Sequence, residues 1–214
     1  FIHNGLFFKN EAFKQALFHA KKYGTKVHVM GLLTDGMSAH ANPEHLYALL
    51  NYFHRNGYSD HVYLHLFTDG RDAPPRSAFR FLKDLRAHMR GETIASIMGR
   101  YYGMDRGKNW DRTEEAFRAI TEGFGRYTAQ SAEEAIEESY TRGETDEYIL
   151  PTVIVNNEGK PSGIVGDNDV LFFFNARSDR ARQLTKAFVQ EDFNGKNPGA
   201  FVRKFIPKNT RFVA

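Results

Sequence analysis

The sequence contains no cysteine, which excludes disulfide bonds and cysteine-ligated metal sites. It has no apolar run of about 18 residues and no signal-peptide pattern, so we expect no membrane association and a cytoplasmic location. Charges nearly balance, with 29 Lys and Arg against 26 Asp and Glu. We therefore also expect no nucleic-acid partner, because neutralising several nucleic-acid phosphates requires a stronger positive stripe.

Several motifs of nucleotide binding and nucleophilic catalysis are missing as well. There is no Gly-x-Gly-x-x-Gly or Gly-x-x-x-x-Gly-Lys-Ser/Thr loop and no Gly-x-Ser-x-Gly elbow. The nine histidines are scattered, and none has the His–carboxylate spacing of a metal site. His61 and His65 lie four apart in a predicted strand, where packing or surface roles are favoured over metal binding. We expect no metal and no cofactor in this chain.

Four short apolar runs alternate with helical patterns. The runs predict strands over residues 26–33, 62–67, 93–98 and 170–174, and the last is apolar throughout, as is typical of strands buried on both faces. Strands that alternate with helices predict an α/β fold with a mostly parallel sheet and helices on both faces. We expect one three-layer domain over residues 1–214.

Local signals place some helix starts and one turn. Capping-box spacing, in which a short polar residue precedes Glu by three positions, marks two predicted helix starts. A cluster of turn-forming residues predicts a hairpin in the less regular region before the last apolar run. These signals lie at Asp111 with Glu114, at Ser131 with Glu134, and at residues 156–159 between expected strands over 152–155 and 160–165.

Arginine gathers in the loops that follow the predicted strands. Ligands of an open parallel sheet bind outside the carboxyl ends of its strands, which here selects loops 34–40, 68–72, 99–106 and 175–180. Three of these loops contain arginine, and every one contains Asp. A guanidinium matches a carboxylate or phosphate bidentately, and several guanidiniums on one edge become favourable around a dianion. A single such arginine is equally well explained as a surface ion pair worth about 0–1 kcal/mol, but three loops together favour an anion site.

The two ends of the chain indicate a fragment of a longer protein. The first residue is Phe, not Met, and the last six residues, NTRFVA, are typical of a strand cut short. Any functional hypothesis therefore has to allow for a missing domain.

Four motifs now indicate a family. GLLTDG, LHLFTDGRDAPPRSA, MGRYYGMDRGKNWDR and FFFNARSDRAR resemble the substrate-binding domain of the cofactor-independent (2,3-bisphosphoglycerate-independent) phosphoglycerate mutases. IHNGLFFKNEAF and NTRFVA resemble that domain's first segment after the hinge and its return strand. The resemblance implies insertion within a missing alkaline-phosphatase-like domain that carries two manganese ions and a serine nucleophile. A family lysine that binds substrate lies beyond this chain.

The resemblance also assigns roles to residues. It implies that Asp72 meets the glycerate hydroxyls and is a candidate for proton transfer, which requires hydrogen-bond reach to the reacting oxygen. Neighbouring arginines should depress its pKa. The implied substrate-binding residues are Arg71, Asp72, Arg100, Arg106, Arg177 and Arg180.

The first loop departs from the family pattern. The family reads SDGGVHSH, and its first His contacts substrate, whereas this chain reads TDGMSAHA. Without a gap the His position falls on Ala39, and a shift of one residue would recruit His40 instead. Both alignments remain open at this point.

The resemblance implies a monomer that binds and orients 3-phosphoglycerate and 2-phosphoglycerate for phosphoryl transfer in glycolysis and gluconeogenesis. Its partners are these substrates and the missing phosphatase-like domain, without which the chain is expected to be inactive. The alternative is a stand-alone module that binds a phosphorylated metabolite without enzymatic activity, which the same arginines would serve. A basic RNA-binding domain is disfavoured by the balanced charge.

Overall fold

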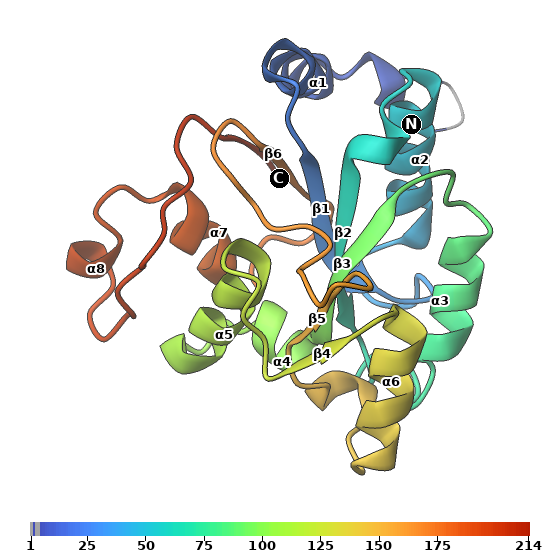
Figure 1. The fold of residues 1–214 in the computed structure, drawn as a ribbon, viewed down its shortest axis with the longest axis vertical. Coiled ribbons are helices and arrows are strands. Elements are labelled where there is room, and N and C mark those ends of the chain that lie inside the picture. Colours follow the sequence, from blue (N-terminus) through green and yellow to red (C-terminus); the bar gives the residue numbers. More distant parts are fainter. Residues whose placement is uncertain (1, 3–4) are drawn as a thin grey trace.

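The computed structural model, which describes residue 2 and residues 5–214, is built on one seven-stranded sheet (Figure 1). The strand order is β4-β5-β3-β2-β1-β6-β7, and every pair is parallel except β3 with β5. The prediction of an α/β fold with a mostly parallel sheet is confirmed. The strands are β1 (Val27–Leu33), β2 (Val62–Thr68), β3 (Thr93–Gly99), β4 (Tyr127–Ala129), β5 (Thr152–Ile154), β6 (Val170–Phe173) and β7 (Arg211–Val213).

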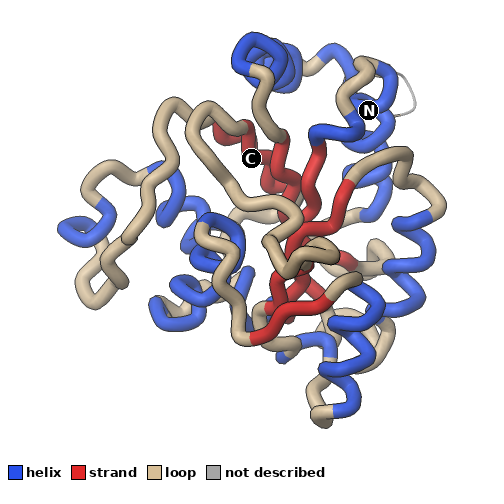
Figure 2. Tube along the Cα trace, viewed as in Figure 1, coloured by secondary structure: helices blue, strands red, loops and turns tan. Residues whose placement is uncertain are grey.

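Helices cover both faces of this sheet, so that the strands lie between two helical layers (Figure 2). One layer contains α1, α2, α3 and α6, and the other contains α4, α5, α7 and α8 (Figure 1). The helices are α1 (Glu11–Tyr23), α2 (Pro43–Arg55), α3 (Ala78–Arg86), α4 (Arg100–Gly103), α5 (Trp110–Thr121), α6 (Ala132–Thr141), α7 (Arg182–Val189) and α8 (Phe193–Lys196), with 3-10 turns at Phe7–Lys9, Ser59–His61 and Asp146–Tyr148.

Aromatic rings fill both interfaces between sheet and helices. Successive residues of a strand point to opposite faces. The Phe172 ring accordingly packs edge-on against Phe13 of α1 and Phe53 of α2, while the Phe173 ring meets Phe67 on the other face. Nearly every residue of β1, β2, β3 and β6 is buried, on both faces of the sheet, which explains why the four apolar runs could be identified as strands from the sequence.

A buried chain of polar side chains crosses the middle of the sheet. The Asp169 carboxylate lies 3.2 Å from His28 Nε2, His28 Nδ1 lies 2.9 Å from His65 Nε2, and His65 Nδ1 lies 2.8 Å from Ser96 Oγ. Burial lowers the pKa of His28 and holds that of His65 well below its usual value, so both rings are neutral. Since the carboxylate only accepts, each ring donates through Nε2 and accepts through Nδ1, and Ser96 donates to His65. His65 thus has a packing role.

The expectation that His61 shares a strand with His65 is wrong. His61 is exposed and ends the 3-10 turn Ser59–His61, immediately before β2 begins. The expected hairpin is also too long. Its turn forms, with Asn156 N–H bonded to Lys160 O and Ser162 N–H bonded to Ile154 O, both at 2.8 Å. Pairing ends there, because β3 and β4 occupy the two edges of β5 at Thr152 and Val153.

Only one of the two predicted N-caps forms. Ser131 caps α6, because its hydroxyl accepts the Glu134 N–H at 3.1 Å. Asp111 lies inside the first turn of α5, which begins at Trp110, and the capping position belongs to Asn109, whose side chain makes no cap hydrogen bond. The predicted Asp111 cap is therefore wrong.

This difference gives a stability prediction. Ser131→Ala should lower the free energy of unfolding by about 1 kcal/mol, because it leaves a helix N–H without its acceptor. Asp111→Ala should cost only a few tenths of a kcal/mol, since it removes a favourable charge near the helix N-terminus but no cap. Urea denaturation of the two variants checks the difference, and equal losses would contradict the assignment.

Candidate functional site

The candidate site lies at the carboxyl ends of β1, β2, β3 and β6. The chain leaves β1 for α2 on one face of the sheet and leaves β6 for α7 on the other. The two loops therefore diverge between β1 and β6, which is where ligands bind in open α/β sheets. Ala176 N–H donates to His40 O at 2.8 Å and ties these two loops together.

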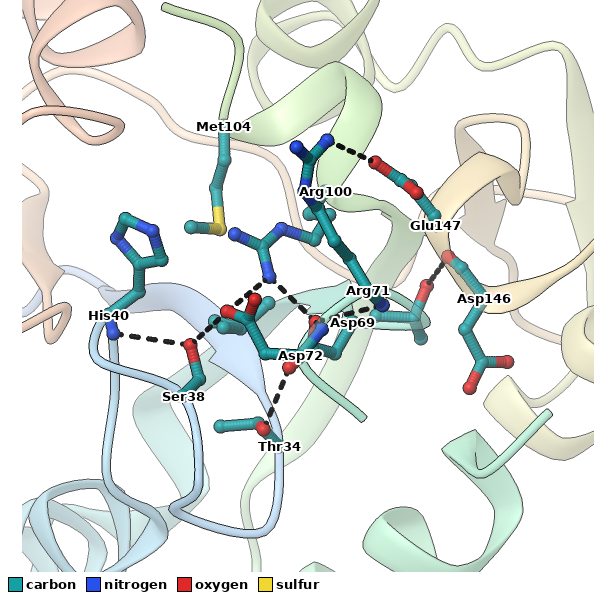
Figure 3. A network of polar contacts seen from close by, with 12 residues as sticks. Thr34, Ser38, His40, Asp69, Arg71, Asp72, Arg100, Met104, Asp146 and Glu147 are labelled. Carbon is teal, nitrogen blue, oxygen red and sulfur yellow. Dashed lines mark hydrogen bonds and ion pairs between the residues drawn. The ribbon is translucent and has the colours of Figure 1, made fainter. Parts of the chain in front are cut away.

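Arg100 is the centre of the site (Figure 3). It begins α4 directly after β3, and its side chain is only 2% exposed. Its Nη1 donates to Asp69 Oδ1 at 2.6 Å and to Asp72 Oδ2 at 2.8 Å. Burial alone would lower the pKa of Arg100, but these bonds raise it, so the guanidinium is charged.

Asp69 shapes the loop after β2 and joins it to β1. Its Oδ1 accepts the Arg71 and Asp72 N–H groups at 3.2 and 3.0 Å, and its Oδ2 accepts the Thr34 hydroxyl at 2.9 Å. One buried carboxylate thus connects the ends of three strands. The sequence interpretation did not assign Asp69 or Thr34, although both follow predicted strands directly.

Asp72 lies beside Arg100 with one oxygen engaged. Its Oδ2 accepts the Ser38 hydroxyl at 2.6 Å as well as Arg100, and in the described residues its Oδ1 has no hydrogen-bond partner. Burial would raise the pKa of Asp72, but the bonds from Arg100 and Ser38 lower it, so it is an ionised acceptor. Its side chain is 34% exposed, which leaves Oδ1 open to a ligand. The sequence interpretation also missed Ser38.

His40, not Ala39, faces this cluster. His40 is buried, its N–H donates to Ser38 Oγ at 3.2 Å, and its Nδ1 lies 3.6 Å from Asp179 Oδ1. Burial lowers the pKa of His40, and the Arg100 charge lowers it further, so the ring is neutral near pH 7. Ala39 is exposed on the same loop.

Arg106, Arg177 and Arg180 form the second half of the cluster. Arg106 Nη1 donates to Asp179 Oδ2 at 2.6 Å, and Arg177 Nε lies 3.0 Å from Asp179 Oδ1. Arg180 Nη1 donates to Met104 O at 3.4 Å. Burial lowers the pKa of Arg180, and repulsion from Arg100, Arg106 and Arg71 lowers it further.

Arg71 lies on the opposite side of Asp72 from His40 (Figure 3). Its Nη1 donates to Glu147 Oε1 at 3.2 Å, and its side chain is 56% exposed. The segment that carries Glu147 packs closely on two glycines: a Cβ on Gly70 would lie 2.4 Å from Glu147 N, and one on Gly99 would lie 2.1 Å from Glu147 O. Glycine at both positions is therefore required for this side of the site.

The chemistry available here is binding of an anion. All six predicted residues come to this strand edge, but their side chains form separate contacts. Arg100 pairs with Asp72, Arg71 with Glu147, and Arg106 and Arg177 with Asp179, while Arg180 bonds the backbone of Met104. No group of three or more His, Asp or Glu in the described residues could hold a metal ion. Nor does that part of the chain contain a helix both long and apolar enough to cross a membrane. A cavity of about 700 Å³ lies elsewhere, between α1 and β7.

Comparison with known proteins identifies relatives. Residues 1–213 match the family described as BPG-independent PGAM N-terminus. A 2,3-bisphosphoglycerate-independent phosphoglycerate mutase 1 of Methanosarcina barkeri is 47% identical over 210 residues, covering 97% of this chain and 39% of the relative. A mutase of the same description from Thermomicrobium roseum is 50% identical over 191 residues, covering 88% of this chain and 36% of the relative.

A solved structure agrees with these relatives. Phosphoglycerate mutase of Leishmania mexicana, crystallised at low cobalt concentration, superposes with a TM-score of 0.88 at 31% identity. The match covers 99% of this chain and 39% of that one. The chain therefore spans less than two fifths of the length of the proteins that it matches.

The Asp72 environment gives a prediction about its ionisation. Ser38→Ala should raise the pKa of Asp72, because the carboxylate loses one of the two bonds that lower it. Ser162→Ala, which removes a hydroxyl beside the other end of β3, should leave it unchanged. Carboxyl NMR titration of the two variants measures the change, and an unaltered Asp72 titration in Ser38→Ala would contradict the role of Ser38.

Proposed function

The chain belongs to the family of BPG-independent phosphoglycerate mutases, and we propose that it is the substrate-binding domain of such an enzyme. In this proposal it binds and orients 3-phosphoglycerate and 2-phosphoglycerate for interconversion by phosphoryl transfer, a step of glycolysis and gluconeogenesis. The observation that carries the proposal is the convergence of Arg100, Arg106, Arg177 and Arg180 beside an ionised Asp72 at the point where the β1 and β6 loops diverge.

Each half of the cluster suits one part of phosphoglycerate. Arg106, Arg177 and Arg180 offer planar donor forks for its phosphate and carboxylate. Asp72 Oδ1 is free to accept a glycerate hydroxyl, and the ionised carboxylate can hold or take its proton. We assign His40 as a neutral neighbour of the bound anion and Arg71 as a further cation that exchanges Glu147 for substrate.

The phosphoryl transfer itself belongs to the remainder of the enzyme. The described residues lack a set of side chains that fits a metal ion. The family resemblance implies two manganese ions and a serine nucleophile, and these would be held elsewhere in the enzyme. When bound, such ions neutralise the charge that develops on a transferring phosphoryl group. This chain's own contribution is to hold the glycerate and to control the proton at its hydroxyl.

An activity assay tests this division of labour. The isolated 214-residue chain should bind 3-phosphoglycerate weakly and show no mutase turnover with or without added manganese, because the other domain is needed to enclose the substrate. Turnover by the purified chain alone would overturn the proposal. If the chain binds 3-phosphoglycerate but the full-length polypeptide also shows no mutase activity, a stand-alone binding module is favoured.

A substitution tests the guanidinium fork. Arg177→Lys keeps the charge but loses bidentate geometry, so it should weaken 3-phosphoglycerate binding about tenfold without unfolding the protein. Arg86→Lys is the matched control, because Arg86 makes a two-pronged ion pair with Glu133 on the surface between α3 and α6. Calorimetry on the full-length polypeptide measures both affinities, and equal affinity in Arg177→Lys and wild type would count against a bidentate role.

A further inference from the structure

Asp179 is the one carboxylate in the described residues that pairs with Arg106 or Arg177. Its Oδ2 takes a 2.6 Å hydrogen bond from Arg106. Its Oδ1 lies 3.0 Å from Arg177 Nε and 3.6 Å from His40 Nδ1. Three groups able to carry positive charge thus surround a single side chain, from the loops after β1, β3 and β6.

The pairing around Asp179 is incomplete. Its Oδ1 and His40 Nδ1 are both buried and have no hydrogen-bond partner, so the short separations give attraction without aligned bonds. Buried polar atoms without partners cost free energy, and most native proteins satisfy them. Here the two unsatisfied atoms lie beside Arg106 and Arg177, and an anion that took the place of the carboxylate would release its unpaired oxygen to water.

Charge gives a second, independent reason. Arg100 is matched by Asp69 and Asp72, and Arg71 is matched by Glu147. In the part of the chain that the structure describes, Arg106 and Arg177 share Asp179 as their one carboxylate partner, and Arg180 makes no ion pair. Burial lowers the pKa of Arg180, and the charges of Arg100, Arg106 and Arg71 lower it further. The Asp179 charge therefore holds the exposed guanidiniums of Arg106 and Arg177 together.

We propose that Asp179 is a positioning residue that stands in for the anionic group of the substrate until the substrate binds. It holds Arg106 and Arg177 together, and the incoming phosphate or carboxylate displaces it from at least one of them. This inference rests on the proposed function of the site. Because Asp179 competes with the substrate, it weakens ground-state binding and helps product to leave.

The test is Asp179→Asn, which keeps the shape of the side chain and removes its charge. In the 214-residue chain, the affinity for inorganic phosphate or for glycerate should rise about fivefold, because the substitution removes one partly exposed ion pair that competes with the anion. The anion whose affinity rises identifies the group, phosphate or carboxylate, that Asp179 mimics. In the full-length enzyme, KM for 3-phosphoglycerate should fall by a similar factor with kcat unchanged or lower. Asp84→Asn, which removes an exposed charge on α3, should change neither quantity.

A purely structural Asp179 predicts the opposite. Unchanged or weaker anion binding in Asp179→Asn would overturn the inference, and Asp179→Glu, which restores the charge, should return affinity toward the wild-type value. If neither phosphate, glycerate nor 3-phosphoglycerate binds the wild-type protein, the proposed function fails, and the inference fails with it.

A second measurement needs no variant and so does not depend on the folding of Asp179→Asn. NMR signals of the Asp179 carboxyl and of the Arg106 and Arg177 guanidiniums are followed while phosphate is added to the wild-type chain. All three should shift along one binding curve as the carboxylate is released. A saturating shift of the arginines with an unmoved Asp179 signal would overturn the inference.

Discussion

The buried guanidinium of Arg100 constrains everything around it. Removing such a charge from water costs on the order of several kcal/mol unless carboxylates compensate for it, and here Asp69 and Asp72 do so from one neighbouring loop. The same Asp69 holds Thr34 at the end of β1. The spacing of three strand ends is thus fixed by one ion cluster, and Asp72 receives its position and its ionisation from that cluster.

Around this rigid centre the other arginines are adjustable. Arg106 and Arg177 are each more than half exposed, and Arg71 reaches Glu147. Under the proposed function, this division would let the buried groups define where the glycerate hydroxyl lies, while the exposed guanidiniums accommodate the phosphate.

Much of the architecture followed from local patterns, because fully buried parallel strands leave apolar runs and strand-end loops collect binding residues. The predictions that failed, and the residue that was missed, depend on contacts that the short sequence patterns do not include. The spacing at Asp111 equals that at Ser131, yet Asp105 bonds both the backbone and the side chain of Asn109, so the loop delivers Trp110 as the first helical residue. Ser38 carries no local sign that its partner is Asp72, 34 residues away.

The polar chain from Asp169 through His28 and His65 to Ser96 has a consequence for how the sheet assembles. Its members come from four segments, and His28 is separated from Asp169 by 141 residues. A partly built sheet without the segment that leads into β6 would leave an imidazole N–H unsatisfied in an apolar interior. The centre of the sheet should therefore open and close as a single cooperative unit, so that a slowly exchanging set of amide protons would span β1, β2, β3 and β6 together.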